Sequence, residues 1–95
     1  MIYELAFKKP ALKEWKKLSV DLQQQFKNKL QERLKSPRVP SAKLSGGENL
    51  YKIKLRQSGY RLVYQVDDHI ILVTVISVGK RERNAVYKNA LARLT

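Results

Sequence analysis

The chain has 95 residues, of which 43% are hydrophobic, and this composition suits one small domain with one core. Its 20 Lys and Arg residues against 8 Asp and Glu residues give a formal net charge of +12. Such an excess favours nucleic acid or another polyanion as the partner, although an acidic protein that masks the charge also fits. No Cys is present, which excludes disulfides and thiolate chemistry. We expect a single domain over residues 1–95.

No targeting or membrane segment is predicted. Residues 1–7 lack the charged start and the long apolar run of a signal peptide. The longest mostly apolar run, residues 70–78, is far shorter than the roughly 18 residues that span a bilayer. We therefore expect a soluble cytoplasmic protein without a membrane partner.

The first residues predict a strand and a short helix. Alternating apolar side chains in residues 2–7 would share one strand face: Tyr3, Leu5 and Phe7. Pro10 suits the first turn of a helix, because its fixed φ and its missing N–H are tolerated there. Apolar residues then recur at helical spacing, at Leu12, Trp15 and Leu18, while lysines point away, among them Lys13 and Lys17. Trp15 is interpreted as a core anchor, with nucleotide stacking as the alternative, and the lysines as solvated or as a track for phosphates.

A second helix and a loop follow. Ser19 suits the N-cap position, and apolar residues recur every four positions until Ser36-Pro37 ends the helix: Leu22, Phe26, Leu30 and Leu34. The short join between the helices predicts an antiparallel αα-hairpin packed on the sheet. Residues 36–49 contain two of the three prolines and two of the four glycines, which indicates a loop.

Residues 51–64, YKIKLRQSGYRLVY, predict a β-hairpin with one apolar and one cationic face. Ser58-Gly59 signals the turn, and a two-residue loop would place Arg56 opposite Arg61 and Leu55 opposite Leu62. This register pairs apolar residues with apolar residues, as a half-buried sheet requires. The cationic face would then carry Lys52, Lys54, Arg56 and Arg61. Like charges on neighbouring strands repel unless an anion binds them, and a solvated sheet face is the alternative interpretation.

The last third of the chain predicts a central strand and a final helix. Asp67-Asp68 signals a tight turn, and residues 70–78 are apolar on both faces until Gly79 ends the strand. Lys80-Arg81-Glu82-Arg83 forms a charged connection, and Asn84 suits the N-cap of a short helix. The order β-α-α-β-β-β-α predicts an α+β fold with a mainly antiparallel four-stranded sheet, packed by the N-terminal αα-hairpin and a short C-terminal helix.

Familiar catalytic sets are absent from the sequence. His69 is the only His and adjoins Asp67-Asp68, so it is interpreted as a turn residue rather than a ligand or general base. Gly46-Gly47 is not followed by the Lys-Ser or Lys-Thr of a phosphate-binding loop. We therefore expect no metal and no cofactor, and any catalysis must come from the cations.

A second cationic group precedes the final helix. Cations are unfavourable at a helix N-terminus, but exposed N–H groups beside arginines are suited to a phosphate. Arg81 is the stronger candidate for this role, whereas Arg83 can be merely solvated. Tyr87, one turn into the helix, is either a core residue or a ring for base stacking with a hydroxyl for hydrogen bonding.

Two blocks, YKIKLRQSGYRLVYQV and VISVGKRERNAVY, resemble the RelE toxins of bacterial toxin–antitoxin pairs, and with ALKEWKKL and KSPR the resemblance covers essentially the whole chain. It implies a microbial-RNase-like fold and an endoribonuclease that cleaves mRNA in the A site of the 70S ribosome, inhibiting translation. It also implies a cognate RelB-like antitoxin that wraps the toxin and can displace its C-terminal helix. Operator DNA would be contacted only through the antitoxin complex, which represses its own operon.

The resemblance assigns the catalytic roles to five residues: Lys52, Lys54, Arg61, Arg81 and Tyr87. Further cations are expected to contact RNA or the ribosome: Lys13, Lys17, Lys43, Arg56, Lys80 and Arg83. One position departs from the family, because Ser45 stands where close members can carry Arg. That auxiliary phosphate contact is not carried over to this chain.

Such a set can act without His or metal. Attack by a 2′-OH on the adjacent phosphorus needs a base, stabilisation of negative charge and a proton for the departing 5′-oxygen. Lys52 or Lys54 can supply the base, because like charges favour the neutral form of an amine. Arg61 can hold the phosphate, Arg81 can stabilise developing charge, and Tyr87 can orient the base.

Two alternatives stay open at this point. One is a toxin of the same fold that inhibits DNA gyrase without nuclease activity. The other is a non-catalytic nucleic-acid-binding module whose cations only hold phosphates.

Overall fold

The structure is a computed structural model that describes residues 2–82 and 84–94. Its elements follow in the order β1 (Glu4–Phe7), α1 (Lys9–Lys16), α2 (Val20–Lys35), the 3₁₀ turn η1 (Pro40–Ala42), β2 (Leu50–Leu55), β3 (Tyr60–Asp67), β4 (Leu72–Lys80) and α3 (Ala85–Arg93). The predicted order of strands and helices is confirmed.

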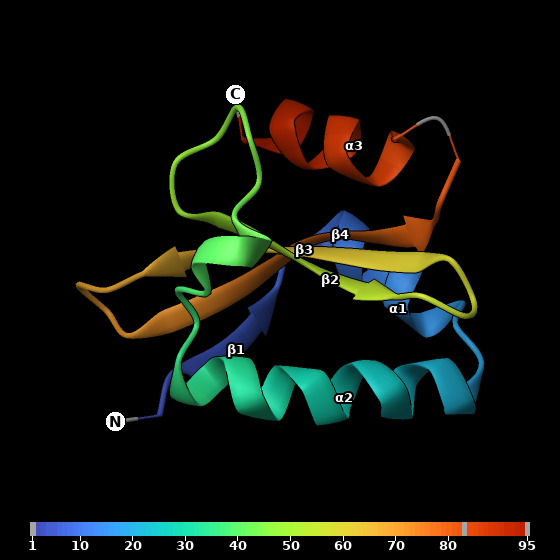
Figure 1. Cartoon of the computed structure of the whole chain (residues 1–95), viewed down its shortest axis with the longest axis horizontal. Helices are drawn as coiled ribbons and strands as arrows, with labels where there is room; N and C mark the ends of the chain where they lie inside the picture. Colours follow the sequence, from blue (N-terminus) through green and yellow to red (C-terminus); the bar gives the residue numbers. More distant parts are fainter. Residues whose placement is uncertain (1, 83, 95) are drawn as a thin grey trace.

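One sheet of strand order β1-β4-β3-β2 separates two helical layers. Figure 1 shows α2 below the sheet, α3 above it and α1 behind it. The pairs β2–β3 and β3–β4 are antiparallel, whereas β1 pairs with β4 in parallel, so the sheet is mixed. The mainly antiparallel description holds for β2, β3 and β4 but not for β1. A parallel pair needs a long crossover, and the helices and the hairpin provide it.

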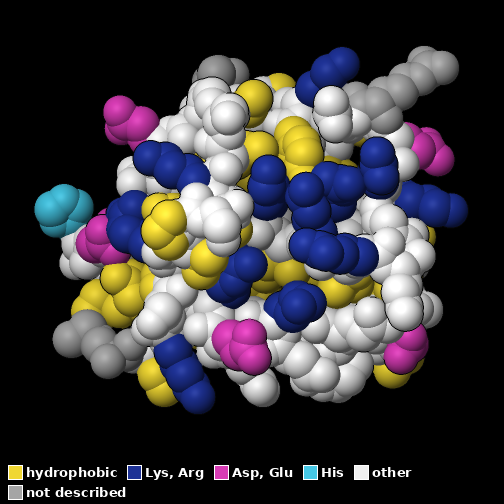
Figure 2. Space-filling view, viewed as in Figure 1, with side chains coloured by type: hydrophobic (Ala, Val, Ile, Leu, Met, Phe, Trp, Pro, Cys, Tyr) yellow, Lys and Arg dark blue, Asp and Glu magenta, His cyan; other side chains and the backbone are white. Residues whose placement is uncertain are grey.

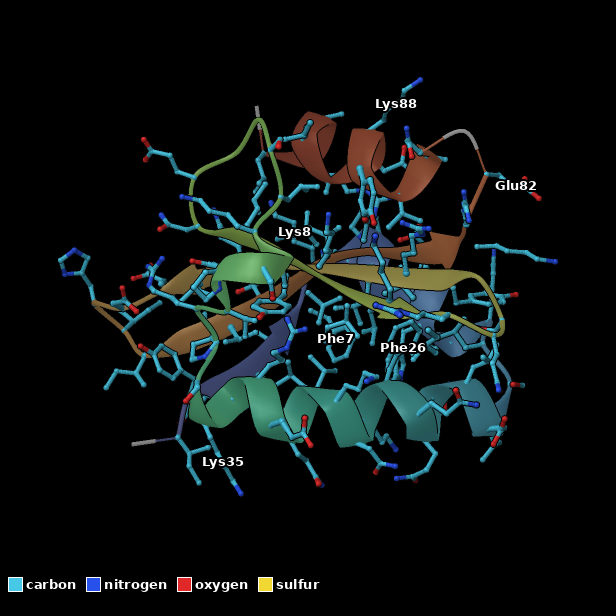
Figure 3. The ribbon with its side chains drawn as sticks, in the orientation of Figure 1. Phe7, Lys8, Phe26, Lys35, Glu82 and Lys88 are labelled. Carbon is cyan, nitrogen blue, oxygen red and sulfur yellow. The ribbon has the colours of Figure 1, made fainter. Side chains whose placement is uncertain are left out.

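The larger core lies between the sheet and the two N-terminal helices. Trp15 packs against Phe7 and Phe26, with ring centroids 5.3 and 6.1 Å away. This confirms Trp15 as a core anchor, and Figure 3 shows Phe7 and Phe26 in the layer between the sheet and α2. Leu12 was expected on the apolar side of α1 but is 37% exposed, and the fully buried Ala11 lies in the core instead.

The start of α2 agrees with the predicted capping. The hydroxyl of Ser19 accepts a hydrogen bond from the N–H of Leu22 at 3.2 Å, which satisfies one of the free donors of the first turn. Pro10 lies in the first turn of α1, as predicted. Residues 17–19 join the two helices, and both helices contribute to the same core.

The hairpin loop has four residues rather than the predicted two. Leu55 pairs with Tyr60 and Lys54 with Arg61, so residues 56–59 form the loop. Gly59 adopts a φ of +77°, and its N–H donates to the carbonyl oxygen of Leu55 at 2.9 Å, which closes the longer turn. The register differs from the prediction by two residues, and a shift of two leaves every side chain on its predicted face. Arg56 thereby leaves the strand and enters the loop.

A β-bulge in β4 determines which side chains face α3. Val63 pairs with Ser77, whereas Tyr64 pairs with Val75, so Ile76 has no partner across the ladder. The extra residue shifts the alternation: Val75 and Val78 both face the larger core, while Ile76 joins the smaller core beneath α3. The buried hydroxyl of Ser77 donates to the carbonyl oxygen of Val86 at 2.6 Å. The bulge therefore gives α3 both an apolar and a polar contact.

Two boundary predictions for β4 are wrong, whereas Asn84 occupies the predicted N-cap position of α3 without the capping contact. Ile70 lies in the preceding turn and is 63% exposed. Gly79 does not end β4 but pairs with Arg61, and a Cβ there would lie 3.2 Å from a methyl group of Val86, so glycine permits the close approach of α3. Asn84 makes no side-chain capping hydrogen bond, because it adopts a left-handed conformation with a φ of 59°.

Glu14 of α1 makes hydrogen bonds that connect α3 with α1 and β4. Its Oε1 accepts hydrogen bonds from the N–H of Val78 at 3.1 Å and from Nη1 of Arg93 at 2.8 Å. The same Arg93 nitrogen donates to the carbonyl oxygen of Ile76 at 2.9 Å. This half-buried ion pair thus joins α1, the part of β4 beyond β1, and the last turn of α3.

We predict that Phe26→Ala lowers the free energy of unfolding by about 3–5 kcal/mol, because it removes a fully buried ring from the larger core. Val20→Ala is the matched control on the same helix, since Val20 is 81% exposed and its loss should cost under about 0.5 kcal/mol. Urea unfolding followed by circular dichroism measures both. Equal losses in the two variants would contradict the described packing.

We also predict an acid-dependent contribution from Asp68. Hydrogen bonds from Arg38 and from the hydroxyl of Tyr3 hold the pKa of Asp68 below its usual range. A lowered folded-state pKa stabilises the fold above the unfolded pKa of about 3.9, and this contribution is lost as the pH falls through the folded value.

Asp68→Asn should therefore be less stable than the parent chain at about pH 6, and the gap should narrow at about pH 2. Urea unfolding at both pH values measures the gap. A gap of constant size would show that the carboxylate does not contribute through ionisation.

Candidate nucleic-acid site

Tyr87 of α3 lies over the cationic face of β2 and β3. Its hydroxyl accepts a hydrogen bond from Nη1 of Arg61 at 2.7 Å. Its ring centroid lies 5.6 Å from Cζ of Arg61 and 5.7 Å from Nζ of Lys52, distances typical of cation–π contacts. Tyr87 is half-buried and also packs against the smaller core. Tyr87 is therefore partly a core residue and also contacts two cations, while its role in base stacking stays a prediction.

A cavity of about 260 Å³ opens beside this contact. Four of its lining residues are cations, and they come from β2, the hairpin loop, β3 and the segment after β4: Lys54, Arg56, Arg61 and Arg81. The backbone N–H of Arg81 donates to the carbonyl oxygen of Gly59 at 2.7 Å, which holds Arg81 beside the hairpin loop. We call this space the first cavity.

The cations of the first cavity have no acidic partners among the described residues. The ion pairs found in that part of the chain join Arg38 to Asp68 and Arg93 to Glu14. Lys54 lies directly opposite Arg61 across the strands, an arrangement of like charges that repel. The first cavity is therefore unfavourable when empty and suited to an anion.

Arg61 also carries a buried donor without a partner. Its Nε is buried and finds no acceptor within residues 2–82 and 84–94. A buried donor left unpaired costs about 1–3 kcal/mol. The guanidinium is thus held in place by Tyr87 at the expense of stability, which is typical of a functional side chain.

The structure brings the five predicted catalytic side chains into this region, while their individual roles stay predictions. Among the predicted RNA contacts, Arg56 lines the first cavity and Lys80 is exposed at the end of β4. Three further lysines are exposed and lie outside the lining of the first cavity: Lys13, Lys17 and Lys43. Lys43 borders a separate depression together with Ser45. Arg83 lies outside the described residues.

Two glycines of the site were missed as functional residues from the sequence. Gly59 lines the first cavity and accepts the hydrogen bond that places Arg81. Gly79 lies opposite Arg61 and beneath α3. An isolated glycine inside a strand pattern is a recognised sign of close backbone approach, and Gly79 carried that signal.

No metal site or membrane span is found in the described part of the chain. Residues 2–82 and 84–94 hold no group of three or more His, Cys, Asp or Glu side chains that could bind a metal ion. His69 lies exposed in the β3–β4 turn, where its N–H donates to Oδ1 of Asp67, which confirms it as a turn residue. Within the same ranges, no helix has the length and apolarity needed to cross a membrane.

The fold and the site define a small basic α+β protein in which the C-terminal helix contacts an arginine of a cationic cavity. Residues 5–85 match the family described as the ParE toxin of type II toxin–antitoxin systems, parDE. The chain belongs to this family of type II toxins.

Known relatives agree in sequence and in structure. The mRNA interferase toxin RelE of Escherichia coli (strain K12) is 56% identical over 94 residues, which cover 99% of each chain. A solved structure of a mutant E. coli RelE in the free state superposes with a TM-score of 0.92 at 54% identity and covers all of both chains. A structure of the E. coli toxin mutant with an antitoxin RelB peptide has a TM-score of 0.83 at 56% identity, covering 95% of each chain. The predicted RelE resemblance is confirmed.

We predict that Arg81→Ala weakens binding of a single-stranded RNA and lowers the magnitude of the log Kd against log salt slope by about 0.7, because one phosphate contact is lost. Fluorescence anisotropy over a series of salt concentrations measures the slope. Lys88→Ala is the matched control, because Lys88 points away from the sheet in Figure 3 and does not line the first cavity. An equal loss of slope in the control would indicate that only net charge matters.

Proposed function

We propose that this toxin is an endoribonuclease that cleaves mRNA in the ribosomal A site and thereby inhibits translation. The observation that carries the proposal is the first cavity, in which four cations without acidic partners among the described residues lie beside Tyr87. The 56% identity to an mRNA interferase supports the choice of substrate.

The arginines bind the reacting phosphate. The planar guanidinium of Arg61, held by its hydrogen bond to Tyr87, presents donors that match phosphate oxygens. Arg81, placed by Gly59, supplies a second guanidinium from the segment after β4. Together they stabilise the negative charge that develops on the equatorial oxygens as the 2′-oxygen attacks.

The lysines transfer protons while the mRNA cleaves itself at the bound phosphate. The 2′-oxygen forms a bond to the adjacent phosphorus, and the bond from phosphorus to the 5′-oxygen breaks. One of Lys52 and Lys54, as the neutral amine, accepts the proton of the 2′-OH, and the other, as the ammonium, gives a proton to the departing 5′-oxygen. The products are a 2′,3′-cyclic phosphate and a 5′-hydroxyl end, and the reaction consumes no water and uses no metal. The ring of Tyr87 stacks on a base or fixes its orientation.

Positioning supplies much of the rate. Lysine and arginine are weak acid–base groups near neutral pH, so alignment of the 2′-oxygen, the phosphorus and the 5′-oxygen has to contribute strongly. Good alignment can be worth about 7–11 kcal/mol of the barrier. The A site of the 70S ribosome provides that alignment by holding the message, and naked RNA should be cut poorly.

A cognate RelB-like antitoxin controls the toxin. E. coli RelE has been solved in complex with a RelB peptide. The excess positive charge of this chain suits an acidic segment of such a partner. Displacement of α3 would remove Tyr87 from Arg61 and so disable the site, and the toxin–antitoxin complex, rather than the toxin alone, would contact operator DNA.

We predict that primer extension on mRNA with programmed ribosomes detects cuts confined to the A-site codon. Lys54→Ala and Arg81→Ala should lose this cleavage by at least about 100-fold, since each removes a charged contact to the reacting groups. Lys88→Ala should cleave normally. The upstream fragment of the cut mRNA should end in a 2′,3′-cyclic phosphate. EDTA, added together with enough Mg²⁺ to keep the ribosome intact, should not slow a single turnover of cleavage.

The same assays separate the two alternatives. Equal cleavage of free RNA would contradict ribosome dependence. Intact toxicity without any cut, together with inhibition in a DNA supercoiling assay, would favour the gyrase-directed toxin. RNA binding that weakens in Arg81→Ala while no variant or parent chain cleaves would favour the binding module.

A further inference from the structure

A second cationic cavity of about 350 Å³ lies along β2, the edge strand of the sheet. Five cations line it, from α2, β2 and the hairpin loop: Lys29, Arg33, Lys52, Lys54 and Arg56. No acidic residue is among the lining residues. Figure 2 shows Lys and Arg side chains gathered on this face of the molecule, over the sheet between α2 and α3. We call this space the second cavity.

Arg33 has neutral hydrogen-bond acceptors at the second cavity. Its Nη1 donates to the carbonyl oxygen of Lys52 at 3.2 Å and to the hydroxyl of Tyr64 at 2.9 Å. Burial raises the pKa of Tyr64, so the hydroxyl stays protonated at neutral pH and donates its own hydrogen to the carbonyl oxygen of Pro37. Both acceptors of Arg33 are therefore neutral, and its charge has no counter-ion within the described residues.

The second cavity concentrates charges that repel one another. Lys29 and Arg33 are four residues apart on α2, where side chains are neighbours and like charges destabilise the helix. Lys52 and Lys54, two residues apart on β2 and therefore on the same face of the strand, line the same cavity. The fold thus brings a like-charged helix pair to a like-charged strand pair. An anion between them would relieve both repulsions.

The two cavities share a wall. Lys54 and Arg56 line both cavities. Arg61 and Arg81 line only the first, and Lys29, Arg33 and Lys52 line only the second. An RNA strand carries one phosphate per nucleotide, so two adjoining cationic cavities match successive phosphates of one strand.

We propose that the second cavity binds a phosphodiester of the substrate RNA strand next to the one that is cleaved. Lys29 and Arg33 are the cations of this subsite that have no part in the proposed cleavage step. Lys52, which also lines only the second cavity, additionally contacts the ring of Tyr87. The inference rests on the proposed function, because it places the second phosphate relative to the reacting one.

Uncleavable RNAs with 2′-O-methyl groups test the subsite apart from catalysis. A dinucleotide has one phosphodiester and fills only the first cavity, whereas a tetranucleotide can reach both. NMR titration at low salt should give the wild-type chain a preference for the tetranucleotide. Lys29→Gln should weaken binding of the tetranucleotide by about 5- to 10-fold and leave binding of the dinucleotide unchanged. The double variant that also carries Arg33→Gln should bind both RNAs equally.

Lys35→Gln is the matched control for Lys29→Gln. Both lysines lie exposed on α2, but Lys35 lines neither cavity and points away from the sheet in Figure 3. It should leave both affinities unchanged. Lys29 makes no side-chain hydrogen bond within the described ranges, so its replacement should not disturb the fold. Arg33→Lys tests whether a positive charge at this position is enough for binding.

Three outcomes would overturn the subsite. The first is a wild-type chain that binds both RNAs equally well. The second is a Lys29→Gln variant that weakens binding of both RNAs equally. The third is a Lys29→Gln variant that weakens binding to ribosomes without mRNA and leaves binding of both RNAs unchanged. The last outcome would assign the cavity to ribosomal RNA. If the tetranucleotide preference depends on Lys29 but programmed ribosomes show no cleavage, the proposed function fails while the cavity stands as an RNA phosphate site.

Discussion

The contact between Arg61 and Tyr87 is the interaction on which the site depends. It joins an interior strand of the sheet to the C-terminal helix, and it fixes a guanidinium that has no carboxylate partner among the described residues. The contact exists only because α3 lies close to the sheet. That closeness comes from the bulge at Ile76, from the hydrogen bond of Ser77 to Val86 and from the small size of Gly79. The Glu14–Arg93 pair then holds the far end of the helix.

Repulsion between the cations of this site lowers the stability of the fold. Two cavities on one face are lined by cations, with Lys54 opposite Arg61 and Lys29 beside Arg33. Stability comes from elsewhere, chiefly from the aromatic core around Trp15 and from the buried faces of β3 and β4. Such a separation lets the cationic face vary without loss of the fold, and it makes binding of an anion favourable before any specific contact is counted.

Side-chain periodicity explains why much of the site could be predicted from the sequence. Strand alternation placed Lys52, Lys54 and Arg61 on one face, and this stayed right even though the loop length was wrong, because the error was an even number of residues. The bulge at Ile76 could not be predicted from alternation. Because β4 is apolar on both faces, an inserted residue does not change its hydrophobic pattern. Asn84 was expected to cap α3 with its side chain, but the backbone needs a left-handed residue there, and local sequence fits both uses. The second cavity was missed because its residues come from α2 and β2, and only tertiary structure brings them together.

The position of the reacting phosphate decides whether the first cavity is the cleavage site. It is tested most directly by a cryo-electron microscopy structure of the toxin on a 70S ribosome programmed with mRNA that carries a 2′-O-methyl group in the A-site codon. We expect the phosphate adjacent to this group to lie in the first cavity, within hydrogen-bonding distance of Arg61 and Arg81, with a base against the ring of Tyr87. A phosphate bound outside that cavity, or a complex in which the face carrying Lys52 and Lys54 points away from the message, would contradict it.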